Sequence, residues 1–326
     1  MKDPIIQLKG LSKNYGSVKA VDDLNLDVYK GEIFGLLGPN GAGKTTTILM
    51  MLGLTDPSSG TAHVCGHNAT NSPIAVKKKV GYMPDSVGFY DNMTALENLM
   101  YIGRLNGLPE NELEARALNI LEIVGLTADS HKKTSAYSRG MKQRLGLADV
   151  LIKNPDVIIL DEPTLGIDPT GVRDFLALIK QLSRQQGLTV LLSSHHLHHV
   201  QQVCDRVGIF VNGKLLAQGD ISTLSGKLFG TDGHVTAITL DQAIPQAWPL
   251  EPELKQWEAI TQLTINQNEL EFTCSSNITA ALVRFLVEKG YDVIGVHQKN
   301  YGLDDIYQKY FESNSIENTS YEKSIE

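Results

Sequence analysis

A loop of mostly small residues, Gly38-Pro39-Asn40-Gly41-Ala42-Gly43-Lys44-Thr45, has the residue types and spacing needed to hold phosphate. Glycines let the backbone curl so that successive amide hydrogens point at one phosphate group. Lys44 supplies positive charge for the β- and γ-phosphates, and the Thr45 hydroxyl can bind Mg²⁺. The alternative is a glycine-rich turn that holds nothing. It is disfavoured by the apolar run at 33–37 and the helix-like run at 46–52.

A second stretch places two carboxylates at the end of an apolar run. Residues 157–160 are Val-Ile-Ile-Leu, and Asp161, Glu162 and Pro163 follow directly. An unbroken apolar run predicts a strand buried in a parallel sheet, whose carboxyl end carries the chemistry. Asp161 is placed to hold Mg²⁺ through water, and Glu162 to polarise or deprotonate an attacking water. The alternative, a solvated acidic pair in a loop, is disfavoured by the buried strand.

Histidines gather after another apolar run, residues 189–194. His195 follows this predicted strand directly, where its ring can donate a hydrogen bond to a phosphate. His196, His198 and His199 come next. His195 and His199 would share one face of a helix, so a metal site is the alternative. No cysteine lies among these histidines, which favours the phosphate role.

Two further segments carry polar side chains suited to a nucleotide. Tyr15 lies in a polar, glycine-flanked loop, where its ring can stack on adenine or can simply close a surface hairpin. Ser138 precedes a predicted helix, and a serine in this position caps the helix. The alternative is that Ser138 and Gly140, at the helix start, bind a second anion through free amide hydrogens.

The chemistry above requires strands whose carboxyl ends meet, and the pattern of apolar residues predicts such strands. Alternation at 5–8 and 21–28 indicates antiparallel strands near the start of the chain. Residues 80–83 predict a strand that Pro84 ends. From 91 to 126 the pattern becomes helical, and Thr94 and Glu97 have the spacing of a capping box.

The remainder of the chain, 226–312, has no chemistry that its residues reveal. Its pattern predicts a small α+β domain, and from Ser313 onward the polar composition predicts a disordered tail. The elements behind this prediction are alternation at 234–240, a hairpin through 263–272, a helix at 278–288 and a strand at 292–296.

Length and composition limit the classes of function. With 326 residues the chain is long enough for two domains, each with its own core. The net charge of -8 gives no basic field for nucleic acid, so no nucleic-acid partner is expected. The three cysteines are widely spaced, which favours neither disulfides nor a zinc knuckle. No stretch is apolar enough to span a bilayer, so membrane association is expected only through a partner.

Taken in chain order, these segments resemble the nucleotide-binding subunit of an ABC transporter. The likeness covers residues 5 to about 225 and implies an α/β P-loop NTPase cassette at 1–225. Such a cassette has a mixed core sheet, an antiparallel β subdomain and a helical subdomain, here at about 91–155. The segments that carry the likeness are the loop with Tyr15, the Walker A loop from Gly38 to Thr46, the strand end Pro84-Asp85, the signature Tyr137-Ser138-Arg139-Gly140-Met141, the Walker B pair Asp161-Glu162, the D-loop Leu165-Gly166-Ile167-Asp168, and His195.

The resemblance implies a role for each of these residues, with ATP and Mg²⁺ as the bound groups. Lys44, Glu162 and His195 would be catalytic, with Glu162 as the base and His195 as the sensor of the γ-phosphate. Thr45 and Asp161 would hold Mg²⁺. The other nucleotide-binding positions would be Tyr15, Gly38, Pro39, Asn40, Gly41, Ala42, Gly43, Thr46, Ser138 and Gly140.

Two departures from the general pattern narrow the subfamily. The usual Leu-Ser-Gly-Gly-Gln signature contains Arg139 and Met141 here, and Asp85 stands where glutamine is usual. Both variants resemble the single-cassette ATPases of ABC-2-type exporters. Asp85 is a further candidate for the metal site, although aspartate is shorter than glutamine and charged. Arg139 could contact phosphate or point to solvent.

The resemblance also implies partners. The chain has one phosphate-binding loop and one signature, so two copies would have to meet around two ATP molecules. Such a dimer would drive an integral membrane permease from the cytoplasmic face of the cell membrane. Two alternatives stay open: a soluble ABC ATPase that acts on ribosomes, nucleic acid or cofactor assembly, and a regulatory module that binds nucleotide but barely hydrolyses it.

Overall fold

The computed structural model divides into two compact units, Met1–Asp220 and Ile221–Glu326. The sequence places this boundary at 225, but helix α8 (Ile221–Phe229) belongs to the second unit. The predicted tail at 313–326 lies outside the described residues. The structure describes residues 3–229, 234–245, 248–299 and 303–309.

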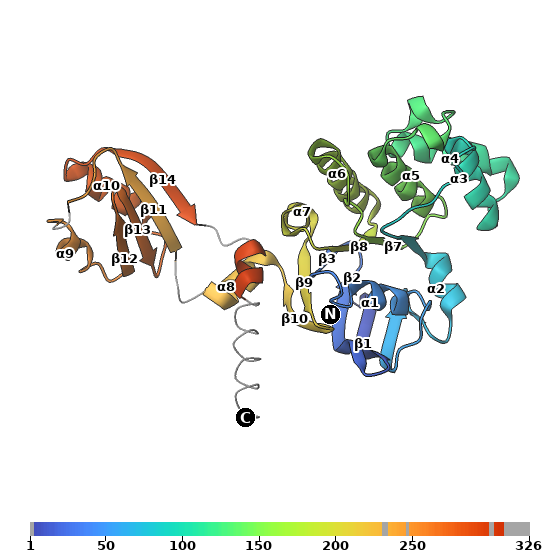
Figure 1. Cartoon of the computed structure of the whole chain (residues 1–326), viewed down its shortest axis with the longest axis horizontal. Coiled ribbons are helices and arrows are strands. Elements are labelled where there is room, and N and C mark those ends of the chain that lie inside the picture. Colours follow the sequence, from blue (N-terminus) through green and yellow to red (C-terminus); the bar gives the residue numbers. More distant parts are fainter. Residues whose placement is uncertain (1–2, 230–233, 246–247, 300–302, 310–326) are drawn as a thin grey trace. The chain divides into compact units, whose positions relative to one another are not determined.

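A six-stranded sheet in the order β10-β9-β3-β8-β7-β6 forms the centre of the first unit (Figure 1). Strand β10 is antiparallel to β9, and the other neighbouring pairs are parallel. Every residue of β3, β7 and β8 is buried, which explains why apolar residues predominate in their sequences. The strands are β3 (Ile33–Leu37), β6 (Val80–Met83), β7 (Val157–Asp161), β8 (Thr189–Ser194), β9 (Arg206–Val211) and β10 (Lys214–Gly219).

A second sheet, in the order β2-β1-β4-β5, is antiparallel throughout, as predicted for the start of the chain. Helix α1 (Lys44–Met51) shares one core with both sheets, because its Ile48 and Met51 pack in the same buried cluster as Phe34 of β3 and Leu8 of β1. The strands are β1 (Pro4–Tyr15), β2 (Val18–Tyr29), β4 (Ser59–Val64) and β5 (His67–Asn68).

Helix α7 (Leu197–Val203) packs against β3 on the side of the sheet away from α1. Gly35 makes this approach possible, because a Cβ atom there would lie 2.5 Å from Cγ1 of Val200. Helix α6 (Pro169–Gln186) lies beside α7 (Figure 1) and is capped by Asp168, which accepts a hydrogen bond from the Gly171 amide. The absence of a side chain at Gly35 thus helps to set where α7 lies.

Three helices, α3 (Ala95–Leu105), α4 (Glu110–Ile123) and α5 (Arg139–Leu151), lie between β6 and β7 in the chain. The capping box predicted at the start of α3 is present: Thr94 and Glu97 each accept a hydrogen bond from the other's backbone amide. The remaining short helices of this unit are α2 (Pro73–Lys79) and the 3₁₀ turns η1 (Thr127–Asp129) and η2 (Thr134–Ala136).

Asp149 on α5 makes the stability of this unit depend on pH. Burial raises the pKa of its carboxyl group to about 6, and the Lys153 charge offsets part of that effect. A carboxyl whose pKa is higher folded than unfolded destabilises the fold once it ionises, so the cost grows from about pH 4 and is complete above about pH 6. We expect Asp149→Asn to raise the unfolding free energy by about 1 kcal/mol at pH 8, with the gain vanishing near pH 4.

Urea unfolding of both proteins across this pH range measures the difference. Asp174→Asn on the neighbouring helix α6 is the matched control, because its side chain is 61% exposed. This control should show no comparable gain at pH 8. An Asp149→Asn protein that is less stable than the wild type at pH 8 would contradict the expectation.

The second unit contains an antiparallel sheet in the order β12-β13-β11-β14, so the predicted small α+β domain is confirmed. Its core includes Phe272 and Leu286, both fully buried. None of the helices in the described parts of the chain is long and apolar enough to cross a membrane. The elements are α8, β11 (His234–Leu240), α9 (Glu251–Leu254), β12 (Ile260–Asn266), β13 (Glu269–Cys274), α10 (Thr279–Glu288), β14 (Val293–Lys299) and a helical segment at 303–309.

Candidate nucleotide-binding site

Strands β3, β7 and β8 end at the same edge of the central sheet. Leu37 at the end of β3 pairs with Ser194 of β8, and Asp161 at the end of β7 pairs with Ser193. The parallel register therefore brings together the three segments that carry candidate chemistry: the glycine-rich loop, the carboxylate pair and His195.

The glycine-rich loop joins β3 to α1, in the strand-to-helix context that its sequence predicts. Gly43 caps α1 in a left-handed conformation with φ of 104°, and a Cβ atom there would lie 2.2 Å from the carbonyl oxygen of Ala20. Residues 39–46, Asp85, Asp161 and Glu162 line a cavity of about 230 Å³ with Ala20. The backbone amides at the start of α1 can therefore face an anion in this cavity.

Lys44 is 6% exposed, and its ammonium is held within the loop. Its Nζ atom donates hydrogen bonds to the carbonyl oxygens of Gly38 at 2.6 Å and Pro39 at 3.1 Å. The same atom lies 3.4 Å from Oε1 of Glu162. A phosphate that enters the cavity would therefore compete with the Glu162 carboxylate for the Lys44 ammonium.

Asp161 is 3% exposed and accepts two side-chain hydrogen bonds. The Thr45 hydroxyl donates to Oδ2 at 2.8 Å, and the Ser193 hydroxyl donates to Oδ1. A carboxylate and a hydroxyl this close together are the oxygen donors that Mg²⁺ prefers. Thr45 and Asp161 therefore fit the metal-binding role that the sequence predicts for them.

Glu162 stands directly after β7 in a strained conformation. Its φ is 48°, which places a non-glycine residue in the left-handed region. The backbone amide of Glu162 donates to the Ser193 carbonyl at 3.2 Å. On the side chain, Oε2 is hydrogen-bonded to Nδ1 of His195 at 2.9 Å, whereas Oε1 is buried and has no hydrogen-bond partner. Backbone strain and a buried oxygen that has an ion-pair partner in Lys44 but no hydrogen bond are together typical of a functional carboxylate.

The other predicted site residues do not line this cavity. Tyr15 ends β1, is 52% exposed, and has the Lys13 ammonium 5.1 Å from its ring centroid. Ser138 caps α5 by accepting a hydrogen bond from the Met141 amide at 3.3 Å. The predicted residues outside the cavity lining are Tyr15, Gly38, Ser138, Gly140 and His195.

Two contacts near the site were not anticipated from the sequence. Ser193, inside the apolar run of β8, fixes Asp161. Arg139 does not line the phosphate cavity. Its guanidinium instead packs against Gly166, where an added Cβ atom would lie 2.6 Å from the guanidinium carbon. Gly166, the single glycine of the D-loop, is the residue whose type could have indicated such a close approach. Within the described ranges, no three His, Cys, Asp or Glu side chains are grouped to hold a metal, which disfavours the histidine metal site.

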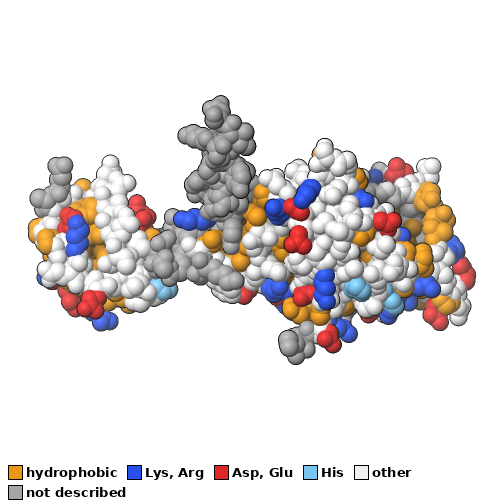
Figure 2. Space-filling model, turned by 90° about the horizontal axis from the view of Figure 1, so that it is seen from below, with side chains coloured by type: hydrophobic (Ala, Val, Ile, Leu, Met, Phe, Trp, Pro, Cys, Tyr) orange, Lys and Arg blue, Asp and Glu red, His pale blue; other side chains and the backbone are white. Residues whose placement is uncertain are grey.

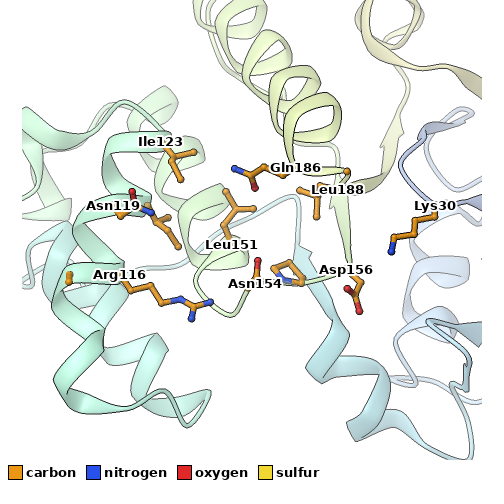
Figure 3. A pocket seen from close by; sticks show the side chains of 13 residues that line it. Lys30, Arg116, Asn119, Ile123, Leu151, Asn154, Asp156, Gln186 and Leu188 are labelled. Atoms are coloured by element: carbon orange, nitrogen blue, oxygen red, sulfur yellow. The ribbon is translucent and has the colours of Figure 1, made fainter.

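A larger cavity of about 710 Å³ lies at the opposite edge of the sheet, where β7 and β8 begin (Figure 3). Lys30, Arg116, Asn154 and Gln186 are among the side chains around it. It contains neither the glycine-rich loop nor the carboxylate pair, so it is not the candidate nucleotide site. Figure 2, which views the molecule from below, shows side chains of both charge signs scattered over the face that it draws, without an extended basic surface.

Known proteins are similar to this chain in both sequence and fold. The family model described as "ABC transporter" matches residues 21–165. The bacitracin transport ATP-binding protein BcrA of Bacillus licheniformis is 43% identical over 215 residues, 66% of this chain and 69% of BcrA. The linearmycin resistance ATP-binding protein LnrL of Bacillus subtilis is 36% identical over 273 residues, 83% of this chain and 86% of LnrL.

Solved structures give the same result. The structure of cbiO1 from Clostridium perfringens, part of the ABC transporter complex cbiONQ, superposes with a TM-score of 0.64 and 28% identity, over 70% of this chain and 92% of that one. A bacterial ABC transporter cassette solved as a dimer has a TM-score of 0.60 and 25% identity, over 66% of this chain and 98% of its own. The chain therefore belongs to the ATP-binding proteins of ABC transporters, and it is an ABC ATPase.

Proposed function

We propose that two copies of this ATPase close around two ATP molecules and power export through a separate membrane permease. The observation that carries the proposal is the grouping of Lys44, Glu162 and His195 beside the phosphate-binding loop. The bacitracin transport and linearmycin resistance relatives favour export as the process that is powered.

Hydrolysis follows from the positions of these side chains. When ATP enters the cavity, the Lys44 ammonium turns from Glu162 to the β- and γ-phosphates. Glu162 then takes a proton from water while the water oxygen attacks the γ-phosphorus and the bond to the leaving ADP oxygen breaks. His195 orients the carboxylate and contacts the γ-phosphate. Thr45 and Asp161, with Asp85 beside them, would hold Mg²⁺, which would supply positive charge to the phosphates.

The second copy supplies the groups that one copy lacks at its own site. Ser138 and Gly140 do not line the phosphate cavity of their own chain, so they are available to nucleotide held by the other copy. The exposed ring of Tyr15 offers a stacking surface for adenine. ATP binding favours the closed pair, and loss of the γ-phosphate returns it to the open state.

The permease contact is proposed at a cavity of about 470 Å³ between the segment after β6 and the start of α5. Asp85, Ser86 and Val87 line one side, and Lys142 and Gln143 line the other. Asp85 also lines the phosphate cavity, so a partner seated here would touch a residue that responds to nucleotide. This contact would hold the chain at the cytoplasmic face of the membrane.

Co-purification tests the proposal. The chain carries a tag in its native cell, membranes are solubilised in mild detergent, and the captured proteins are identified. We expect a polytopic membrane protein in stoichiometric amount. Ser86→Lys, on the proposed contact surface, should reduce its recovery, whereas Ser17→Lys, in the exposed turn between β1 and β2, should not. Recovery from cytosol with a ribosome, nucleic acid or an assembly complex would overturn the transporter role.

A further inference from the structure

Four histidines after β8 each have a different neighbour, and the proposed function uses only His195. The His196 ring lies between those of His195 and His199, with centroid distances of 3.9 Å and 5.1 Å. Nε2 of His198 is hydrogen-bonded to the Gln202 side chain at 2.7 Å, within helix α7. Nδ1 of His199 is hydrogen-bonded to Oγ1 of Thr164 at 3.1 Å. This last contact joins α7 to a different segment of the chain.

Thr164 belongs to the turn that follows the catalytic carboxylate. It is 4% exposed, so its hydroxyl has little access to water. The Leu165 amide donates to the Glu162 carbonyl at 3.2 Å, and the Ile167 amide donates to the Thr164 carbonyl at 3.4 Å. These bonds make Thr164 part of the same turn as Glu162. The turn therefore has a side-chain anchor on α7.

Each end of this connection lies close in the chain to one residue of the catalytic pair. His195 stands two residues before α7 begins, and Glu162 stands two residues before Thr164. The His195–Glu162 bond and the His199–Thr164 bond therefore link the same two segments at two points. With two hydrogen bonds between them, neither the segment at the start of α7 nor the turn after β7 can rotate about one bond without breaking the other.

We propose that His199 is a positioning residue whose hydrogen bond to Thr164 keeps His195 aligned with Glu162 during ATP hydrolysis. This role rests on the proposed function, because it acts through His195 and Glu162. Burial and the neighbouring imidazoles lower the pKa of His199. The lowered pKa favours the neutral ring, and a neutral ring with its proton on Nε2 can accept the proton of the Thr164 hydroxyl at Nδ1.

A pair of substitutions separates the hydrogen bond from the bulk of the ring. His199→Phe keeps an aromatic ring and removes the bond, whereas His199→Asn keeps a polar atom near the position of Nδ1. We expect His199→Phe to lower kcat by about 10-fold with KM for ATP unchanged, because the phosphate-binding loop is not touched. His199→Asn should recover most of the rate. The melting temperature of each variant will show whether it folds.

Matched variants make the test specific. His198→Phe is the same change on the same helix, and it should leave kcat unchanged because His198 bonds only within α7 among the described contacts. Thr164→Val should reproduce the loss caused by His199→Phe, and the double variant should lose no more than either single variant. Additive losses, or His199→Asn as slow as His199→Phe, would overturn the role of the bond.

The variant His195→Ala distinguishes failure of this role from failure of the proposed mechanism. If His195→Ala leaves kcat unchanged, the catalytic pair is wrong and the role of His199 is overturned with it. If His195→Ala lowers kcat while His199→Phe is fully active, the catalytic pair stands and only the positioning role is overturned.

Discussion

Glu162→Gln should lower kcat for ATP hydrolysis by about 10²–10³-fold while ATP still brings two copies together. The amide has the shape of the carboxylate but cannot take a proton from water. It can still accept a hydrogen bond from His195 and does not disturb the loop that holds phosphate. The chemical step is therefore lost and the binding step is kept.

Phosphate release measures the first effect, and light scattering during size-exclusion chromatography with and without ATP measures the second. Glu122→Gln on helix α4 is the control, because it makes the same change on an exposed side chain outside the cavity lining. Unchanged turnover in Glu162→Gln would remove Glu162 from its assigned role. Loss of the ATP-dependent dimer in that variant would show that the carboxylate is needed for closure as well.

The centre of the site could be predicted from the sequence because its parts are local motifs on buried strands. The glycine spacing marks the loop, and unbroken apolar runs mark the strands that lead to Lys44 and Asp161. Parallel strands bring their carboxyl ends to one edge, so loop and carboxylates had to meet once both strands were placed in one sheet. No contact between distant residues had to be guessed.

The contacts that complete the site could not be predicted in this way. Ser193 bonds to Asp161 from within an apolar run, where a serine looks like any other small core residue. The left-handed backbone of Glu162 depends on what its strand meets after folding, and its local sequence does not require it. The approach of Arg139 to Gly166 joins the start of α5 to the turn before α6. Each of these features depends on tertiary packing.

The partners of the clustered histidines also could not be predicted from the sequence. Spacing alone placed His195 and His199 on one helical face and raised a metal site as an alternative. In the structure, the His195 ring is hydrogen-bonded to Glu162 and the His199 ring to Thr164, so the two rings have separate partners in the turn after β7. The residue types were informative, but the direction of each side chain was decided by its neighbours.

Lys44→Met should weaken ATP binding by about 10²-fold, because a charge-assisted contact to phosphate is worth about 1.5–3 kcal/mol and Lys44 would make more than one. A fluorescent ATP analogue titrated against both proteins measures this loss. Lys180→Met, on α6 and outside the cavity lining, makes the same change elsewhere and should bind as tightly as the wild type. Equal affinity of Lys44→Met and wild type would contradict the phosphate role.

The same substitution should also destabilise the protein in the absence of nucleotide. The Glu162 side chain is 12% exposed, and the Lys44 ammonium at 3.4 Å is the cation that faces its Oε1. Removing one member of a buried ion pair leaves an uncompensated charge, which costs about 3 kcal/mol or more. Thermal unfolding without ATP should therefore show a lower melting temperature for Lys44→Met. In the double variant Lys44→Met/Glu162→Gln, stability should return because the lone charge is gone, whereas ATP affinity should stay low. Recovery of both properties in the double variant would mean that Lys44 serves only to neutralise Glu162, and that phosphate is held by the loop amides alone.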